Sequence, residues 1–354
     1  MAEAEEAFDD GWTTHPDDDE DGPPRLRSVY MGGAGVIQGL HELQERGLVE
    51  LRGDYAPYLD QDYVPDWPED DHERSLSFGD TGIRLVLQRI APSSANADRL
   101  AELIAANAHD EHRELMWGSA GTMLAAAELH GSTGEARWLE LWQESAAWLE
   151  DERDPESGVW TQVIVGKPAR YLGPAHGFAG CMLALASFAP SADLHERAAE
   201  VARRYAVEED GLANWPRLTD IDLQAPEGRI RVQWCHGAPG IVASLARFAP
   251  DDAEHDRLLR AGGELTWHAG PLAEKAGICH GTAGNGYAFL ALLERTGDEL
   301  WLERARAFAM HAAAQVVRAR EAHGRGRFTL WTGDPGVALY LADCLAGSGE
   351  LPLP

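Results

Sequence analysis

Apolar residues recur every three to four positions in seven segments of the chain, a spacing that predicts seven buried helix faces. The segments read VIQGLHEL, IRLVLQRI, TMLAAAELH, CMLALASF, IVASLARF, NGYAFLALLERT and VALYLADCL. A second helical stretch lies between them, as in ARWLELWQESAAWLE at 136–150 and ELWLERARAFAMHAAAQVVRAR at 299–320. The pattern therefore predicts a chain of helix pairs, with the more apolar helix of each pair buried.

A Gly-x-x-Gly motif precedes each apolar segment, and seven such motifs indicate a repeat architecture where one would be weak evidence. The first glycines are Gly32, Gly79, Gly118, Gly177, Gly237, Gly281 and Gly333, about 50 residues apart on average. Glycine at a helix entry permits positive φ and close approach of neighbouring backbones. The last repeat is as apolar as the middle ones, which favours a closed ring over an open solenoid. A closed ring would gather all seven motifs at one mouth.

Composition narrows the class of protein. The 354 residues are 44% hydrophobic, enough to bury a substantial core, and no run of 18 apolar residues predicts a membrane span. The net charge of −29 argues against nucleic acid or an anionic membrane as partner. Four cysteines indicate a reducing compartment, so we expect a cytoplasmic protein. Residues 1–25 are strongly acidic and predict a disordered tail.

Cys-His-Gly occurs twice, at the fifth and sixth motifs. Cys235, Cys279 and one histidine form a ligand set suited to zinc, with the fourth position open as in catalytic zinc sites. A Cys235–Cys279 disulfide is disfavoured by the compartment, and simple packing suits Cys181 and Cys344 better, because those two lie within apolar helices. The residues alone do not choose between His236 and His280, and ligation by both would close the site.

With these motifs in place, the chain resembles the lanthionine synthetase C-like (LanC-like) family. The resemblance covers nearly the full chain, and its most specific blocks are CHGAPG and CHGTAGNGYAFL. It implies a single domain over residues 26–354, an all-α fold, and an α/α toroid of seven inner and seven outer helices. His236 stands where peptide-lantibiotic cyclases of the family commonly carry tyrosine, which places the chain closer to the eukaryotic-type, glutathione-binding branch.

The resemblance also singles out site residues. It implies zinc ligands at Cys235, Cys279 and His280, and catalytic positions at Glu114, His176, Arg231 and His236. Taken singly, Glu114 could be a helix surface charge, His176 a core histidine, and Arg231 an ion-pair partner.

The implied activity is zinc-dependent addition of a thiol, from glutathione or a peptide cysteine, to dehydroalanine or dehydrobutyrine, which yields a thioether. Arg231 would stabilise the enolate, His176 would deliver a proton to the α-carbon, and Glu114 would orient His176 or bind the amine of the thiol substrate. A partner dehydratase or spontaneous elimination would supply the dehydroamino acid. We favour glutathione addition over peptide cyclisation, and the alternative from another class is a non-catalytic zinc- and glutathione-binding scaffold.

Overall fold

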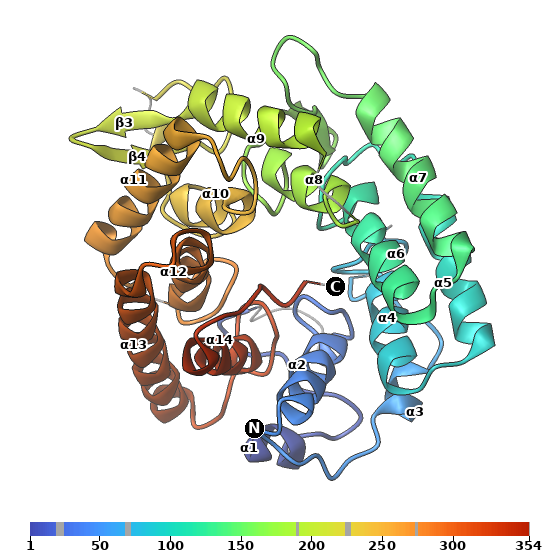
Figure 1. The fold of residues 1–354 in the computed structure, drawn as a ribbon. Coiled ribbons are helices and arrows are strands. Elements are labelled where there is room, and N and C mark those ends of the chain that lie inside the picture. Colours follow the sequence, from blue (N-terminus) through green and yellow to red (C-terminus); the bar gives the residue numbers. More distant parts are fainter. Residues whose placement is uncertain (19–24, 68–71, 189–190, 224–227, 273–274, 354) are drawn as a thin grey trace.

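The computed structural model describes residues 1–18, 25–67, 72–188, 191–223, 228–272 and 275–353. Seven inner helices surround a common axis in these residues (Figure 1). They are α2 (Gly33–Glu45), α4 (Asp80–Ile90), α6 (Ser119–Thr133), α8 (Phe178–Leu185), α10 (Ala238–Leu245), α12 (Thr282–Thr296) and α14 (Asp334–Ala346). Each inner helix contacts the next, and α14 contacts α2, so the ring is closed.

An outer layer of helices packs around this ring (Figure 1). Its long members are α5 (Ser94–Asn107), α7 (Ala136–Asp151), α9 (Ala192–Tyr205), α11 (Ala253–Ala269) and α13 (Glu299–His323). Two short helices, α1 (Ala2–Glu6) and α3 (Ala56–Leu59), bring the total to fourteen in the part of the chain that the structure describes. The predicted all-α toroid is confirmed.

Two small antiparallel hairpins interrupt the helical pattern, and the apolar periodicity does not predict them. One pairs β1 (Gln162–Ile164) with β2 (Lys167–Ala169), and the other pairs β3 (Val207–Glu209) with β4 (Leu212–Asn214). Each lies in a connection that enters an inner helix, ahead of α8 and α10 respectively.

The glycine motifs are explained by close backbone packing at the start of each inner helix. The first glycine is the N-cap in all seven repeats. A Cβ on the second glycine would lie 1.8 to 2.2 Å from the carbonyl oxygen six residues earlier, for example 1.8 Å from Trp234 O at Gly240. Gly237 also has φ +113°, a conformation that side chains with a Cβ rarely adopt. The motif is therefore a packing requirement repeated seven times.

Backbone hydrogen bonds join the turns that precede neighbouring inner helices. The N–H of Cys235 donates to Cys279 O (3.0 Å), and the N–H of Cys279 donates to Trp331 O (2.9 Å). The series continues from Trp331 to Tyr30 O (3.3 Å) and from Tyr30 to Ser77 O (2.9 Å). Because consecutive turns are bonded to one another, side chains far apart in sequence are fixed around one opening. We call this end of the ring the mouth.

The N-terminal residues differ from the disordered tail that the sequence predicts for residues 1–25. In residues 1–18, Trp12 is 3% exposed and its Nε1–H donates to Ala4 O (2.6 Å). Phe8 packs against Trp12 and Tyr55, with ring centroids 4.9 and 5.2 Å away. These two aromatic side chains supply the apolar burial that the acidic composition hides. The rest of the predicted tail, residues 19–24, lies outside the described residues.

Among the described residues, no helix combines the length and the apolar character that crossing a bilayer requires.

Candidate functional site

A cavity of about 360 Å³ opens at the mouth of the ring, and we call it the mouth cavity. Its lining includes six of the seven site residues that the sequence analysis singles out: His176, Arg231, Cys235, His236, Cys279 and His280. The seventh, Glu114, is fully buried and hydrogen-bonds to His176. Most of the lining comes from the two positions that precede the first glycine of each motif, which explains why distant repeats contribute to one site.

Two thiols and one imidazole form a compact group in this cavity. The ligand atoms of Cys235, Cys279 and His280 all lie within 4.8 Å of one another, and both cysteines are free. Of the two histidines that the residues alone leave open, His280 lies in this group with the two sulfurs and His236 does not.

The two thiols share a hydrogen bond that separates their acidities. A hydrogen bond from Cys279 lowers the pKa of Cys235 well below its usual value, and the same contact, with burial, raises the pKa of Cys279 well above it. Cys235 is thereby favoured as a thiolate, and the Sγ–H of Cys279 donates the hydrogen bond that this thiolate accepts. Two buried sulfurs and an imidazole at this spacing fit the donor set that zinc prefers.

Glu114 is positioned as a fixed acceptor for His176. Its carboxylate accepts backbone N–H groups from Met116 (2.8 Å), Trp117 (2.5 Å) and Gly118 (3.0 Å). Its Oε2 also lies 2.9 Å from Nδ1 of His176. Because backbone N–H groups only donate, the carboxylate acts as acceptor throughout, and Nδ1–H of His176 is the donor in this pair. The Trp117 ring stacks on His176 with centroids 4.9 Å apart.

His236 lies beside His176 without joining the thiol group. Their ring centroids are 6.4 Å apart, and Tyr171 stacks on His236 at 6.1 Å. Burial lowers the pKa of His236, and its Nδ1 is buried with no hydrogen-bond partner. A neutral imidazole is therefore held at the edge of the cavity.

Comparisons with known proteins agree with this arrangement. The family described as lanthionine synthetase C-like protein matches residues 69–352, most of the chain. The chain belongs to the lanthionine synthetase C-like family. It is 33% identical over 156 residues to LanC-like protein GCL1 of Arabidopsis thaliana, covering 42% of this chain and 34% of that protein. It is 37% identical over 121 residues to Glutathione S-transferase LANCL1 of Danio rerio, covering 32% of this chain and 28% of that protein. The matched stretches thus span about a third of these curated relatives.

The solved structure of nisin cyclase has the same fold as this LanC-like protein. The two superpose with a TM-score of 0.63 over 89% of this chain and 88% of that one, at 16% sequence identity. At this identity the likeness supports the toroid alone.

The mouth of this LanC-like protein gathers positive charge, although the chain as a whole is strongly acidic. Arg231 lines the mouth cavity and is exposed. Arg231 and Arg217 both act electrostatically on His236, and Lys275 acts on Cys279. The buried Glu114 carboxylate and the acidic Cys235 thiol lie at the same site, and the exposed Arg231 is the cation placed to pair with an anionic ligand.

Tyr30 is a site residue that the sequence analysis missed. It lines the mouth cavity and hydrogen-bonds to Cys279, and burial together with the nearby sulfurs raises the pKa of its hydroxyl well above the usual value. Tyr30 precedes Gly32 by two residues, the register that Cys235 and Cys279 hold before their own glycines. Aligning the seven repeats on their glycines would have identified it.

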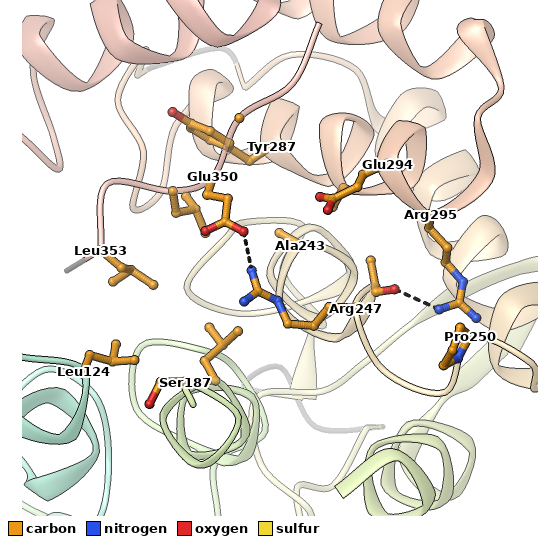
Figure 2. Close-up of a pocket in the computed structure, with 15 residues that line it drawn as sticks. Leu124, Ser187, Ala243, Arg247, Pro250, Tyr287, Glu294, Arg295, Glu350 and Leu353 are labelled. Atoms are coloured by element: carbon orange, nitrogen blue, oxygen red, sulfur yellow. Dashed lines mark hydrogen bonds and ion pairs between the residues drawn. The ribbon is translucent and has the colours of Figure 1, made fainter. Parts of the chain in front are cut away.

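A second cavity, of about 500 Å³, lies where α8, α10 and α12 end, and we call it the far cavity (Figure 2). The C-terminal segment contributes Glu350 and Leu353 to its lining. Arg247 reaches across to Glu350 at 3.1 Å (Figure 2). Arg295 is 4% exposed and donates to Ala246 O and Phe248 O, each at 2.8 Å.

Proposed function

We propose that this LanC-like protein adds a thiol to dehydroalanine or dehydrobutyrine in a peptide or protein, and that the product is a thioether. The observation that carries the proposal is the mouth cavity, where two free thiols and the imidazole of His280 lie beside a histidine held by a buried glutamate. The zebrafish relative is named a glutathione S-transferase, which agrees with chemistry on a thiol.

Cys235, Cys279 and His280 would hold a zinc ion. Zinc supplies one effect when bound, which is to lower the pKa of a thiol that coordinates it. The buried position of both sulfurs and the hydrogen bond from Tyr30 to Cys279 would fix the ligands in place.

His176 is the group that we assign to proton transfer. Since its Nδ1–H donates to Glu114, Nε2 is the ring nitrogen left for the cavity. Nε2 would take the proton of the incoming thiol while sulfur bonds to the β-carbon and the π electrons shift toward the adjacent carbonyl. The same proton would then pass to the α-carbon, which balances the addition without another reactant. His236 lies close enough to act as a second proton carrier.

Arg231 would stabilise the enolate that forms between these two steps, because a guanidinium stays charged at all working pH values. Together with Arg217 and Lys275, it also favours an anionic thiol over a neutral one. Glutathione fits this preference, which is why we place it ahead of a cysteine within the same peptide.

The electrophile must arise elsewhere, by loss of water from serine or threonine. A partner dehydratase or spontaneous elimination would supply it. Free thiols at the mouth fit a reducing compartment, and we propose that the protein acts in the cytoplasm.

The test is incubation of the protein with glutathione and a peptide that contains dehydroalanine, followed by mass spectrometry. We expect an adduct whose rate scales with protein concentration. In a parallel arm, a peptide with its own cysteine tests cyclisation, read by the loss of the alkylatable thiol because ring closure leaves the mass unchanged. Binding of glutathione with no adduct and no ring on any dehydroamino-acid peptide would establish a non-catalytic scaffold instead.

A further inference from the structure

The segment that follows Trp12 crosses from the N-terminus to the end of α13. Arg325, just beyond α13, donates to the side chain of Thr13 and to Thr14 O. Arg327 pairs with the carboxylate of Asp18, which also accepts a hydrogen bond from Thr332 Oγ1 (2.6 Å). Because Thr332 directly precedes the seventh glycine motif, this segment is bonded to the rim of the mouth.

A buried histidine in this segment has an unused ring nitrogen. His15 is 2% exposed, and its Nδ1 accepts the backbone N–H of Asp17 at 3.2 Å. Its Nε2 is buried without any hydrogen-bond partner. A neutral imidazole whose Nδ1 accepts a hydrogen bond carries its proton on Nε2, so this arrangement leaves a buried N–H unpaired, which is costly.

Two further groups face this imidazole. Oδ2 of Asp17 lies 3.7 Å from Nδ1 of His15 and 3.6 Å from Nε2 of His323, the last residue of α13. The two imidazole rings meet edge to face with centroids 4.6 Å apart. Both nitrogen–oxygen separations exceed hydrogen-bond length. All three residues offer ligand atoms within 4.8 Å of one another.

These separations suit a shared ion. Ligand atoms about 2.1 Å from a tetrahedral metal lie roughly 3.4 Å apart, close to both distances observed here. His15 would therefore bind through Nδ1, in place of its contact with the N–H of Asp17, and Nε2 would carry the ring proton. Two imidazoles and one carboxylate form a set that borderline transition metals such as zinc, nickel and copper prefer, whereas calcium and magnesium favour oxygen ligands throughout. Arg325 and Arg327 are nearby cations, but both are engaged by other groups of the segment.

We propose that His15, Asp17 and His323 bind a divalent transition metal, and that this ion fastens the N-terminal segment to the end of α13. The site is separate from the group formed by Cys235, Cys279 and His280, and it shares no residue with it. Bound metal would hold Asp18 against Thr332 and so would order the rim of the mouth at the seventh repeat.

The test uses zinc and nickel as probes on the full chain. In the Cys235→Ala/Cys279→Ala background, which removes the mouth ligands, calorimetric titration of metal-free protein should still show one bound ion per chain. Adding His323→Ala or Asp17→Asn should weaken this binding at least tenfold. His311→Ala, on the same helix, is the matched control and should bind as the background does.

Amide exchange provides a second readout. Zinc should slow exchange in residues 12–18 of the background protein and should leave the His323→Ala version unchanged. Since His323 and Asp17 are partly exposed, their substitution avoids the folding risk of replacing the buried His15. Binding that is unaffected by His323→Ala and Asp17→Asn, or a background protein that binds no ion, would overturn the proposal.

Discussion

The mouth cavity and the far cavity are built by the same inner helices, yet only the smaller one carries reactive groups. The α12 helix shows the contrast: Cys279 and His280 stand just before it, and Glu294 and Arg295 lie at its other end. In the far cavity, Arg247 is paired with Glu350, and Arg295 is bonded to backbone carbonyls (Figure 2). In the mouth cavity, two sulfurs, an imidazole and the buried Nδ1 of His236 remain available for a ligand.

This difference shows that the volume of a cavity is a poor guide to its function in this fold. The far cavity is larger, about 500 Å³ against 360 Å³, but its arginines Arg247 and Arg295 are already engaged by Glu350 and by backbone carbonyls. The turns at the mouth are held to one another by backbone bonds, so the side chains before each glycine can vary without loss of the ring. Each prediction below either breaks this contrast or sharpens it.

The largest effect is expected at the mouth thiols. Cys279→Ala should lose zinc from the mouth and thioether formation together, because it removes a buried ligand and the hydrogen bond to Cys235. The measurement is zinc per chain by elemental analysis, compared with the parent protein, beside the adduct assay. Cys344→Ala is the matched control, since Cys344 is buried in α14 away from the cavity. Unchanged zinc in the Cys279 variant would disprove its role as ligand.

The next largest effect is expected at His176, the proposed proton carrier. His176→Ala should keep zinc but lose roughly 10²- to 10⁴-fold in turnover, the usual contribution of an acid–base group. Glu114→Gln should lose less, and it should also shift the pH–rate profile because it weakens the hydrogen bond to Nδ1. His268→Ala, exposed on α11, is the control. Parent-level turnover in the His176 variant would move the proton transfer to another group, with His236 next in line.

We expect low pH to destabilise the protein through His255, which lies near the far cavity. Burial lowers the pKa of His255 from 6.5 to about 4, and its Nε2 contacts Leu245 O at 3.2 Å. Between pH 4 and pH 6.5, His255 binds a proton in the unfolded chain but not in the folded one. The free energy of unfolding is therefore highest above pH 6.5 and decreases as the pH falls toward 4. The loss should approach about 3 kcal/mol. Denaturant unfolding across this range should show a shallower decline for His255→Gln, with His268→Gln as control. An equal decline in both variants would contradict the assignment.

The smallest effect is expected from the far-cavity ion pair. The side chains of Arg247 and Glu350 are 45% and 71% exposed, so Arg247→Ala should cost no more than about 1 kcal/mol. Turnover and zinc content should match the parent. A marked loss of adduct formation would show that the far cavity takes part in the reaction, and the contrast between the two ends would fail.

The closed ring of inner helices could be predicted from the sequence because the feature that determines it, the glycine motif, is a short local pattern. Each second glycine avoids a clash with a carbonyl six residues earlier, so the same short motif had to recur at every inner helix. The placement of Cys235 and Cys279 at one mouth followed from closure of that ring. Spacing alone did not separate His280 from His236, because both occupy the same register before their glycines. The family resemblance implied His280, and in the structure His280 is the one that lies with the two sulfurs.

Other features depend on contacts that no local pattern records. The acidic composition of the N-terminus hides the buried Trp12 and the partly buried Phe8, which packs against it. Taken singly in the sequence, Tyr30 cannot be distinguished from an ordinary core aromatic residue. Its contact with the site is visible only in the structure, where the first and sixth repeats lie together and Tyr30 hydrogen-bonds to Cys279. The far cavity is lined in part by the C-terminal segment, whose Pro352 O accepts a hydrogen bond from Gln38, 314 residues away in sequence.

The most direct measurement of the central proposal is X-ray absorption at the zinc edge, with and without glutathione. The His323→Ala variant should be used so that only the mouth binds zinc. We expect two sulfur neighbours at about 2.3 Å, from Cys235 and Cys279, and a third when glutathione is added. A sulfur count that stays at two with glutathione present, or zinc without sulfur neighbours, would contradict the account.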